Sequence, residues 1–442
     1  MTSLPGPIET WRMMNTDPLG LFQKVGVEQQ PTLRRHGLRR FITLSHPDHL
    51  EHVLTTHSDR YEKGPILTQI LRPYLGNGLL TSHGDQWRRH RKIISPAFRA
   101  RNIERYTPII IDHTDKKVSD WREAASKRLP INMAIEMSEL SLQIVCSSLF
   151  SETIKEAEIA DIISALQNIR SETRLGDILG LTGLLPRIEK PSRRRAIRLL
   201  NDTVLNVISR RRASNTSYSD LLDQLITAKD NDTGEPLPET LLVDEIKTLF
   251  IAGYETTAVF LTWAFYNLAL SAPLDALLNK EIKNLSSASL LDDLNSGRFR
   301  EVENFLSEIL RLYPPVPVLS RRATVDDAVA GVNIPRGALI DLNIWLAHRH
   351  PDYWQEPDKF NIKRFDDAIT AKRHKYAYLP FGGGARICIG KSFALQEAPL
   401  ILIKTLQAFK FEYREKKQPH SVGSFILQPK DGLRLYPSIR QN

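Results

Sequence analysis

The longest run of hydrophobic positions predicts a helix over about residues 238–271. Its apolar side chains lie on most sides of the helix, so it should be deeply buried. Gly253 and Glu255 stand near its centre, where a glycine and a buried acid are both locally costly. The Thr256 hydroxyl can donate to the Ala252 carbonyl, which bends a helix. Two interpretations stay open: packing through small residues with a structural partner for Glu255, or room for a small ligand beside a proton relay.

Shorter patterns predict further helices and a few strands. Amphipathic spacing predicts a series of helices over residues 102–229, interrupted by an apolar segment with Gly and Pro at 176–188, and another helix over 394–409. Residues 62–82, rich in Gly, Pro and Leu, predict a long irregular connection of the kind that often forms a binding loop. Residues 231–236 cluster turn-forming residues and predict a loop. Strands are predicted at residues 41–44, 331–342, 425–427 and 433–435.

The composition limits the class of protein. A chain of 442 residues with 41% hydrophobic residues suits one large domain or two ordinary ones, with a sizeable core. There are 60 Lys and Arg against 51 Asp and Glu, and the net charge of +9 favours acidic partners. No short basic run alternates with aromatic residues as a nucleic-acid surface would. The arginine runs at 193–195 and 210–212 are interpreted as solvated helix faces.

Targeting and redox features predict a soluble, cytoplasmic protein. No run approaches the roughly 20 apolar residues of a membrane-spanning helix, and residues 1–35 lack the pattern of a signal peptide or membrane anchor. Cys146 and Cys388, the two cysteines, lie far apart in the sequence. They make no disulfide framework, indicate a reducing compartment, and cannot supply a four-cysteine zinc or iron–sulfur site.

One short stretch, from Phe381 to Gly390, carries the strongest chemical signal. It holds three consecutive glycines, then Arg386, then Cys388 just before a predicted helix. A thiolate at a helix N-terminus faces free N–H groups and the positive end of the helix dipole, so its charged form is favoured. Arg386 could reach an anionic group beside a bound metal. The ordinary alternative is a glycine loop before a helix, with an unreactive buried cysteine.

The ten positions fit the pattern Phe-x-x-Gly-x-Arg-x-Cys-x-Gly, and Ala394 and Glu397 follow at the expected offsets. The stretch resembles the haem-binding signature of the cytochrome P-450 family. The resemblance implies that Cys388 ligates the iron of haem b, within a loop bounded by Phe381 and Gly390.

Other stretches match the family in the family's order. Trp87 and Arg91, four residues apart on a predicted helix, resemble its Trp-x-x-x-Arg contact to haem propionates. Alone, the same stretch would be interpreted as a solvated basic helix, with His90 not a metal ligand. Arg321 and Arg386 are the further propionate contacts that the resemblance implies, and Arg321 matches better than Arg322.

The hydrophobic helix itself carries a family motif. Residues 252–257 resemble the oxygen-activation motif Ala-Gly-x-Glu/Asp-Thr. The resemblance implies that Glu255 and Thr256 are catalytic and that Ala252 and Gly253 line the haem.

A predicted helix with an acid and a base three residues apart completes the set of motifs. Glu308 and Arg311 resemble the family's Glu-x-x-Arg pair, and Arg364 resembles the arginine that joins them in a buried network. On its own such a pair usually lies on a surface. Asn361 stands where the family has a proline after Phe360, a minor departure because the arginine spacing is kept.

The resemblance spans about residue 40 to the C-terminus. It implies a mainly α fold with small β-sheets, an α+β class, in which residues 1–442 form one triangular helical domain. It implies a monooxygenase that inserts one oxygen atom of O2 into a C–H bond. A thiolate ligand favours O–O cleavage, and the protein orients the substrate, delivers protons and excludes water.

Three alternatives stay open: a family member that uses or rearranges peroxides, a haem-thiolate sensor without turnover, and a non-haem helical binding protein. The intact Glu255–Thr256 pair argues against the first, because such members often lose it. The number of motifs argues against the third.

Substrate and partners are less determined. Stretches expected to line the pocket are mainly apolar, which favours a lipophilic substrate such as a fatty acid or terpenoid. Electrons are expected from a separate ferredoxin or flavodoxin, because the roughly 54 residues after Cys388 are too few for a reductase domain. A monomer without nucleic acid or membrane span is expected. The pocket candidates are Ile66, Leu67, Leu181, Leu249, Val316, Val318 and Phe425.

Overall fold

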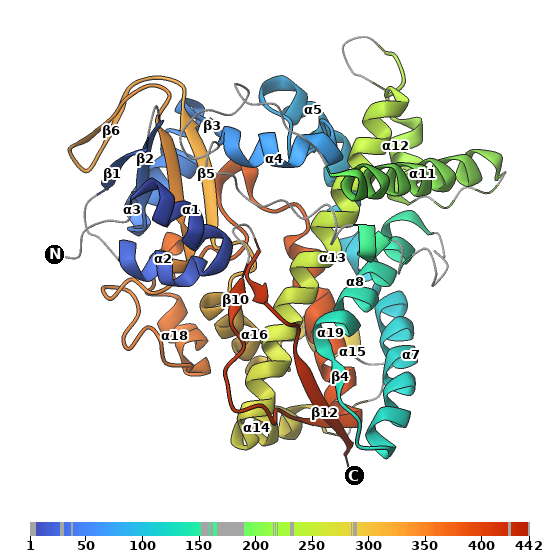
Figure 1. Ribbon diagram of the computed structural model, residues 1–442. Coiled ribbons are helices and arrows are strands. Elements are labelled where there is room, and N and C mark those ends of the chain that lie inside the picture. The colour runs from blue at the N-terminus through green and yellow to red at the C-terminus, as the bar shows by residue number, and fades with distance from the viewer. Residues whose placement is uncertain are drawn as a thin grey trace.

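The computed structural model places a sheet-rich part beside a larger helical part (Figure 1). The sheet-rich part joins N-terminal strands to strands from beyond residue 318, and helix α13 (Glu239–Leu270) runs through the helical part. The predicted mainly α fold with small sheets is confirmed. The structure describes residues 6–26, 31–36, 39–151, 159, 162–165, 190–214, 216, 218, 220–229, 234–283, 285, 290–422 and 426–440.

The helices before α13 are α1 (Pro7–Thr16), α2 (Pro18–Val25), α3 (Pro47–Glu51), α4 (Pro65–Leu75), α5 (Gly84–Ile94), α6 (Ala100–Glu104), α7 (Thr107–Ser126), α8 (Met133–Phe150), α11 (Pro191–Ala213) and α12 (Leu221–Thr227). Those after it are α14 (Ala272–Ile282), α15 (Leu290–Asn295), α16 (Arg300–Leu312), α17 (Ile344–Ala347), α18 (Asp367–Thr370) and α19 (Lys391–Ala408). Short π and 3-10 turns are η1 (His52–Thr56), η2 (Ser58–Arg60), η3 (Ser95–Phe98), η4 (Ile362–Phe365), η5 (Lys375–Ala377) and η6 (Gly384–Arg386).

The largest sheet joins residues far apart in the sequence. Its strand order is β1-β2-β8-β5-β3, from β1 (Thr32–His36), β2 (Arg39–Leu44), β3 (Tyr61–Lys63), β5 (Val318–Ala323) and β8 (Leu339–Asn343). Strands β3 and β5 are antiparallel, and their register sets Lys63 opposite Arg321. The sheet thereby brings two cations of the site to one edge.

Three smaller sheets complete the described strands. They are β4 (Ile131–Asn132) with β12 (Arg434–Ile439) and β9 (Phe409–Glu412), β6 (Asp327–Val329) with β7 (Val332–Ile334), and β10 (Ser421–Val422) with β11 (Gln428–Pro429).

Helix α13 is buried as its sequence predicts. Phe250 and Leu261 are among its buried side chains, and the Phe250 ring meets that of Phe150 from α8 edge-on at 5.0 Å. Predicted helices over residues 238–271 and 394–409 are confirmed by α13 and α19. Helices α6, α7, α8, α11 and α12 confirm the predicted helical series, while residues 176–188 lie outside the described residues.

The prediction of an irregular connection over residues 62–82 is wrong, because α4 occupies Pro65–Leu75. Proline is tolerated at the first turn of a helix, where its missing N–H would have no partner. Gly76 ends the helix at φ +64°, a conformation that glycine adopts without strain. The Gly and Pro that suggested a loop are instead the boundaries of a helix.

Three smaller sequence predictions change. The segment 331–342 holds two strands, β7 and β8, rather than one. Ile426 and Leu427 precede β11 instead of forming a strand, and Phe425 lies outside the described residues. Arg211 is buried, not solvated, because its guanidinium pairs with Asp220 at 2.7 Å and with Asp223 at 2.6 Å. The strands over 41–44 and 433–435 are confirmed by β2 and β12.

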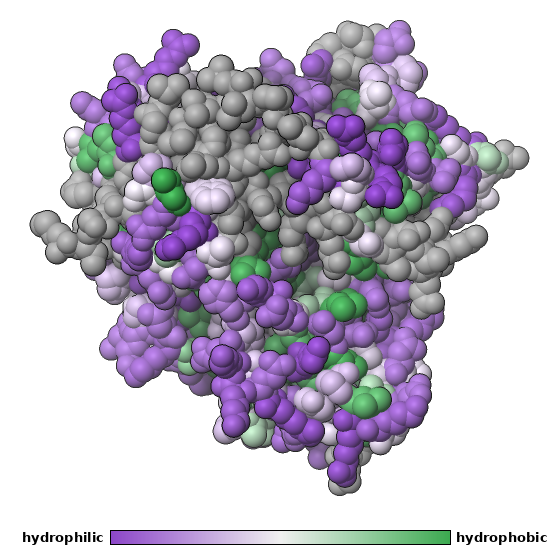
Figure 2. All heavy atoms as spheres, viewed as in Figure 1, coloured by the Kyte–Doolittle hydropathy of each residue, from purple (hydrophilic) through white to green (hydrophobic). Residues whose placement is uncertain are grey.

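Within the described residues, α8 is long and apolar enough to cross a membrane, as is the sharply bent pair of α13 and α14 taken together. Of the α8 stretch, 61% is buried inside the protein. In Figure 2, hydrophilic residues cover most of the described surface on this face, and hydrophobic residues surface in small groups.

Candidate active site

The Cys388 loop is held in shape by its glycines and by one backbone bond. Gly382 and Gly384 have φ of +71° and +66°, which strains residues with a side chain. A Cβ at Gly384 would lie 1.8 Å from the Leu54 carbonyl oxygen, so only glycine fits against η1. The N–H of Cys388 donates to the Phe381 carbonyl at 3.0 Å. This closed loop places Cys388 just before the first residue of α19.

The Cys388 sulfur lies where it can bind a metal. Cys388 is exposed. The surrounding protein nevertheless desolvates the thiol, and this desolvation raises the pKa of the Cys388 thiol. The backbone N–H groups of Gly390 and Lys391 and the charge of Arg91 act in the opposite direction on that pKa. An accessible thiol that meets amide donors fits a thiolate ligand, because a bound metal ion removes the proton outright.

A second accessible surface lies at the centre of α13. Ala252 is exposed, and Thr256 is only half-buried, although Tyr254 and Thr257 are buried. The Thr256 hydroxyl donates to the Ala252 carbonyl at 2.8 Å, as the sequence predicts. Ala252 and Thr256 therefore offer accessible surface in the middle of the motif.

Gly253 and Glu255, two further residues of the motif, lie in different surroundings. A Cβ at Gly253 would lie 2.9 Å from a methyl carbon of Val145, so this glycine allows α13 and α8 to approach closely. Gly253 therefore serves helix packing, and the expectation that it also lines the haem stays a prediction. Glu255 is half-buried in the helix centre, next to Thr256.

A cluster of basic side chains lies near Cys388: Arg321 is buried, and Lys63, Arg91 and Arg386 are half-buried. Burial lowers the pKa of Lys63 to about 6; the charges of Arg386, Arg321 and Arg91 lower it further, and the charge of Glu245 opposes them. Burial likewise lowers the pKa of Arg321 to about 10, and the charge of Arg386 adds to this shift. These groups disfavour one another's charged forms, and a nearby anion would favour those forms.

The cluster fits the two carboxylates of haem b. Arg386 has a buried Nη1 atom without a hydrogen-bond partner among the described residues, and its guanidinium stacks 4.1 Å from the Trp87 ring centre. Trp87, Arg91, Arg321 and Arg386 could therefore hold propionates, as the sequence predicts. Arg322 is exposed and pairs with Glu62, so it does not join them.

Two residues of this site escaped the sequence analysis. Lys63 stands on the short strand β3, and its Nζ donates to the carbonyls of Leu79 and Leu80 at 2.8 and 2.6 Å. Glu245 is buried, accepts from the Leu79 N–H at 3.0 Å, and lies 2.7 Å from His90 Nδ1. No local pattern marks either residue, since only strand pairing and helix packing bring them here. His90 thus points to Glu245, consistent with its exclusion as a metal ligand.

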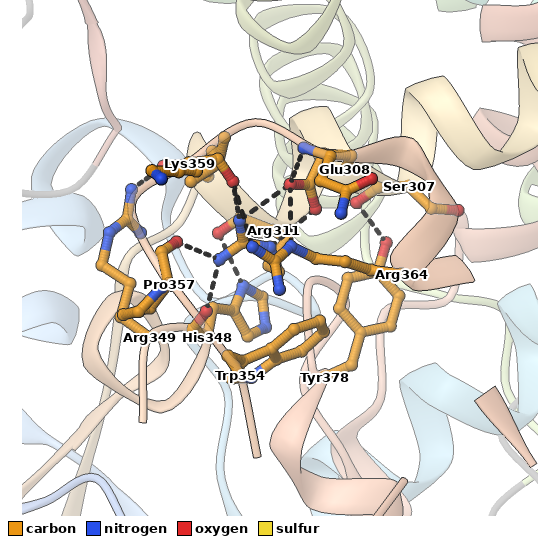
Figure 3. A network of polar contacts seen from close by, with 12 residues as sticks. Ser307, Glu308, Arg311, His348, Arg349, Trp354, Pro357, Lys359, Arg364 and Tyr378 are labelled. Carbon is orange, nitrogen blue, oxygen red and sulfur yellow. Dashed lines mark hydrogen bonds and ion pairs between the residues drawn. The ribbon is translucent and has the colours of Figure 1, made fainter. Parts of the chain in front are cut away.

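A buried charge network centres on Glu308 and Arg311 (Figure 3). Arg311 donates to both carboxylate oxygens of Glu308, at 2.6 and 2.8 Å, and both side chains are wholly buried. It also donates to the carbonyls of His348 and Pro357, at 2.9 and 2.6 Å. Arg364 approaches Glu308 at 3.4 Å. The three predicted members therefore meet, although the sequence pattern alone favoured a surface pair.

The network reaches the cysteine loop through His348. Its Nδ1 lies 3.1 Å from the Arg311 carbonyl, and its Nε2 accepts from the Leu379 N–H at 2.8 Å, two residues before Phe381. Burial lowers the pKa of His348 to about 3, so the ring is neutral. A neutral ring with an accepting Nε2 carries its hydrogen on Nδ1 and donates it to the Arg311 carbonyl.

The pocket candidates lie in different surroundings. Leu249 on α13 is buried, and Val316 and Val318 near β5 are half-buried. Val318 packs against the cluster around Trp345 and Leu427. Leu181 and Phe425, and the side chains of Ile66 and Leu67, lie outside the described residues.

Comparisons with known proteins agree with this geometry. The family model "Cytochrome P450" matches residues 15–435. The chain belongs to the cytochrome P450 family. Members bind haem b through a cysteine thiolate and act as monooxygenases that use O2, a substrate and a redox partner.

Individual relatives cover nearly the whole chain. "Putative cytochrome P450 132" of Mycobacterium tuberculosis is 32% identical over 90% of this chain and 87% of its own length. "Ultra-long-chain fatty acid omega-hydroxylase" of Homo sapiens is 28% identical over 89% of this chain and 78% of its own length. The solved structure "Crystal structure of cytochrome P450DA heme domain" superposes with a TM-score of 0.83 at 25% identity, covering 99% of this chain and 97% of that one.

We expect Cys388→Ser to remove the thiolate signature while leaving most of the fold intact. Cys146, the other cysteine, is wholly buried in apolar surroundings and cannot replace it. The measurement is the ferrous–carbon monoxide spectrum, with Cys146→Ser as the matched control that should keep the red-shifted band. A red-shifted band in the Cys388→Ser protein would show that another residue ligates the iron.

We expect Glu308→Ala to reduce haem incorporation and to destabilise the fold by roughly 3–5 kcal/mol, because Arg311 would stay buried without its carboxylate. The measurements are the ratio of Soret to protein absorbance and urea unfolding. Glu123→Ala is the matched control, since Glu123 on α7 is exposed and its ion pair with Lys127 lies at the surface. Full haem content and unchanged stability in Glu308→Ala would contradict a supporting role for the network.

Proposed function

We propose that this P450 monooxygenase hydroxylates a lipophilic substrate such as a fatty acid or terpenoid. The observation that carries the proposal is the accessible surface of α13 at Ala252 and Thr256, in the middle of a helix whose side chains are mostly apolar and buried. Leu249 on the same helix adds apolar surface, and a pocket of this kind suits a hydrocarbon chain. The similarity to the human fatty acid omega-hydroxylase gives further support for this substrate class.

The reaction converts R–H, O2, two electrons and two protons into R–OH and water. Haem b, when bound at Cys388, supplies the chemistry that activates O2. Glu255 and Thr256 are proposed to move the protons. Because the Thr256 hydroxyl donates to Ala252, its oxygen stays available to accept a hydrogen bond, for example from a water that carries a proton inward. Trp87, Arg91, Arg321, Arg386 and Lys63 are proposed to hold the two propionates.

The electron donor is proposed to be a separate ferredoxin or flavodoxin that docks beside the Cys388 loop. Arg88, Arg89 and Lys92 on α5 and Lys391 at the start of α19 are exposed. The charge of Arg88 is felt by Arg386 in the loop, which places this end of α5 beside the loop. We further propose a cytoplasmic monomer in which residues 1–442 form one domain.

We expect the purified enzyme to hydroxylate a long-chain fatty acid when it is given a surrogate ferredoxin system. Thr256→Ala should bind the same fatty acid, seen as a haem spin-state shift, but should divert much of the reduced oxygen to peroxide. The measurement is hydroxylated product formed per electron consumed. Thr262→Ala is a matched control, because the Thr262 hydroxyl makes the same bond, to the Ala258 carbonyl at 2.6 Å, from a buried position.

Each alternative has its own outcome in this assay. Product formed from hydrogen peroxide but never from O2 and electrons would replace the proposal with a peroxide-using enzyme. A spin-state shift without any product would indicate a sensor. An unchanged ratio in Thr256→Ala would remove Thr256 from the proton path.

We expect reduction by an acidic ferredoxin to slow as ionic strength rises, because opposite charges steer the encounter and salt screens them over about 8 Å at physiological ionic strength. Charge reversal in Arg88→Glu or Lys92→Glu should slow stopped-flow reduction without changing substrate binding. Lys410→Glu makes the same charge reversal at an exposed lysine on β9, and it should leave the rate of reduction unchanged. A rate that is flat with salt in all proteins would exclude this docking surface.

A further inference from the structure

A group of histidines gathers on the sheet-rich side of the molecule, apart from the residues assigned to the haem. His46 stands just before α3, and His350 lies in the turn that follows α17. The His46 ring lies 5.0 Å from the rings of both His49 and His350, measured between ring centres. Residues about 300 positions apart in the chain thus bring imidazoles together.

Three possible metal ligands meet here: His46, His350 and Asp352 each have a donor atom within 4.8 Å of the other two. In the part of the chain that the structure describes, no other three residues of these types come so close together. His350 Nδ1 lies 3.9 Å from Asp352 Oδ2. Ligands of a tetrahedral zinc ion with bonds of about 2.0 Å stand about 3.3 Å from one another. Small side-chain rotations would close the group onto an ion, and Asp352, 51% exposed, has room for one.

The buried member of the group has an unused polar atom. His350 is fully buried, and its Nε2 has no hydrogen-bond partner among the described residues. Its other nitrogen accepts only a long bond of 3.4 Å from the Asp352 N–H, and His46 Nδ1 accepts a similar one of 3.3 Å from the Asp48 N–H. A buried and a half-buried imidazole with long, weak bonds leave lone pairs that a metal could use.

His49 also packs against the group, since its ring centre lies 5.0 Å from that of His46. The other titratable groups facing the rings are Asp48, whose Oδ2 lies 3.7 Å from His46 Nδ1, His52, and Tyr353, whose hydroxyl lies 3.4 Å from His46 Nε2.

We propose that His46, His350 and Asp352 bind one divalent transition-metal ion, with Zn2+ as the species that fits best. Two imidazoles and a carboxylate are typical zinc ligands, whereas Mg2+ and Ca2+ prefer oxygen ligands alone. A water molecule or the Tyr353 hydroxyl would complete four ligands. Nothing in the proposal depends on the substrate or on turnover.

Such an ion would join the start of α3 to the turn at residues 348–354. That turn also holds His348, which bonds to the Arg311 carbonyl and the Leu379 N–H, and Trp354, whose ring lies 5.0 Å from the Arg311 guanidinium. The ion would therefore restrain the segment through which the buried charge network reaches the cysteine loop. Its role would be structural.

The test is a calorimetric titration of the full-length, haem-loaded protein with Zn2+ after removal of bound metals, in a buffer that contains Mg2+. We expect one saturable Zn2+ site per chain. Asp352→Asn and His46→Asn should each weaken binding roughly 100-fold or more, since even the loss of an outer-shell partner costs 10–100-fold. Zn2+ should also raise the Tm of the wild-type protein, because it binds the folded state, and not that of Asp352→Asn.

Matched variants keep the proposal falsifiable. Asp358→Asn makes the same change in an exposed acid that follows the same turn, and His420→Asn removes an exposed histidine elsewhere. Both should bind Zn2+ as the wild type does. The proposal is overturned if the wild type shows no saturable site, if Asp352→Asn binds with unchanged affinity, or if either matched variant loses as much affinity. Equal Soret bands across the series would show that the variants are folded.

Discussion

The buried pair of Glu308 and Arg311 is the interaction on which the active-site architecture depends. A guanidinium without contact with water is tolerated only when its donors are matched, and here a carboxylate and three carbonyls take them. Those carbonyls belong to His348, Pro357 and Lys359, which lie well beyond α16 in the chain. One residue thus fixes the path of the segment that leads to the cysteine loop, and the loop inherits its position from that path.

The electrostatics of the site also follow from removing charged groups from water. The cysteine meets backbone N–H groups, and the cations around it repel one another in a setting that desolvates them. Such an arrangement is unfavourable in the protein alone and becomes favourable with an anionic cofactor. Haem b, with two carboxylates and an iron that takes a thiolate, satisfies both requirements at once. The site is therefore built for its cofactor as much as for the substrate.

The two sides of the molecule are linked through the turn at residues 348–354. The carbonyl and the imidazole of His348 bind the network, and His350 and Asp352 in the same turn lie near His46 at the start of α3. A long-range contact of this kind restrains two segments that are distant in sequence, which reduces the freedom of both. The sheet-rich part thus contributes to the site through restraint, and through Lys63 and Arg321, which β3 and β5 set opposite each other.

The sequence by itself determined the features that depend on local chemistry. The Cys388 signature and the Thr256-to-Ala252 spacing each lie within ten or fewer consecutive residues, where backbone geometry alone sets the relation between side chains, and the hydrophobic length of α13 is read from one continuous stretch. Over residues 62–82 the prediction from the sequence was wrong, because proline and glycine mark the ends of a helix as readily as they mark a loop. Only the tertiary structure decided that Gly253 serves helix packing, that Arg211 is buried, that Lys63 joins the cations, and that His46 meets His350. These facts rest on strand register and helix packing between distant segments, and no local pattern encodes which segments will meet.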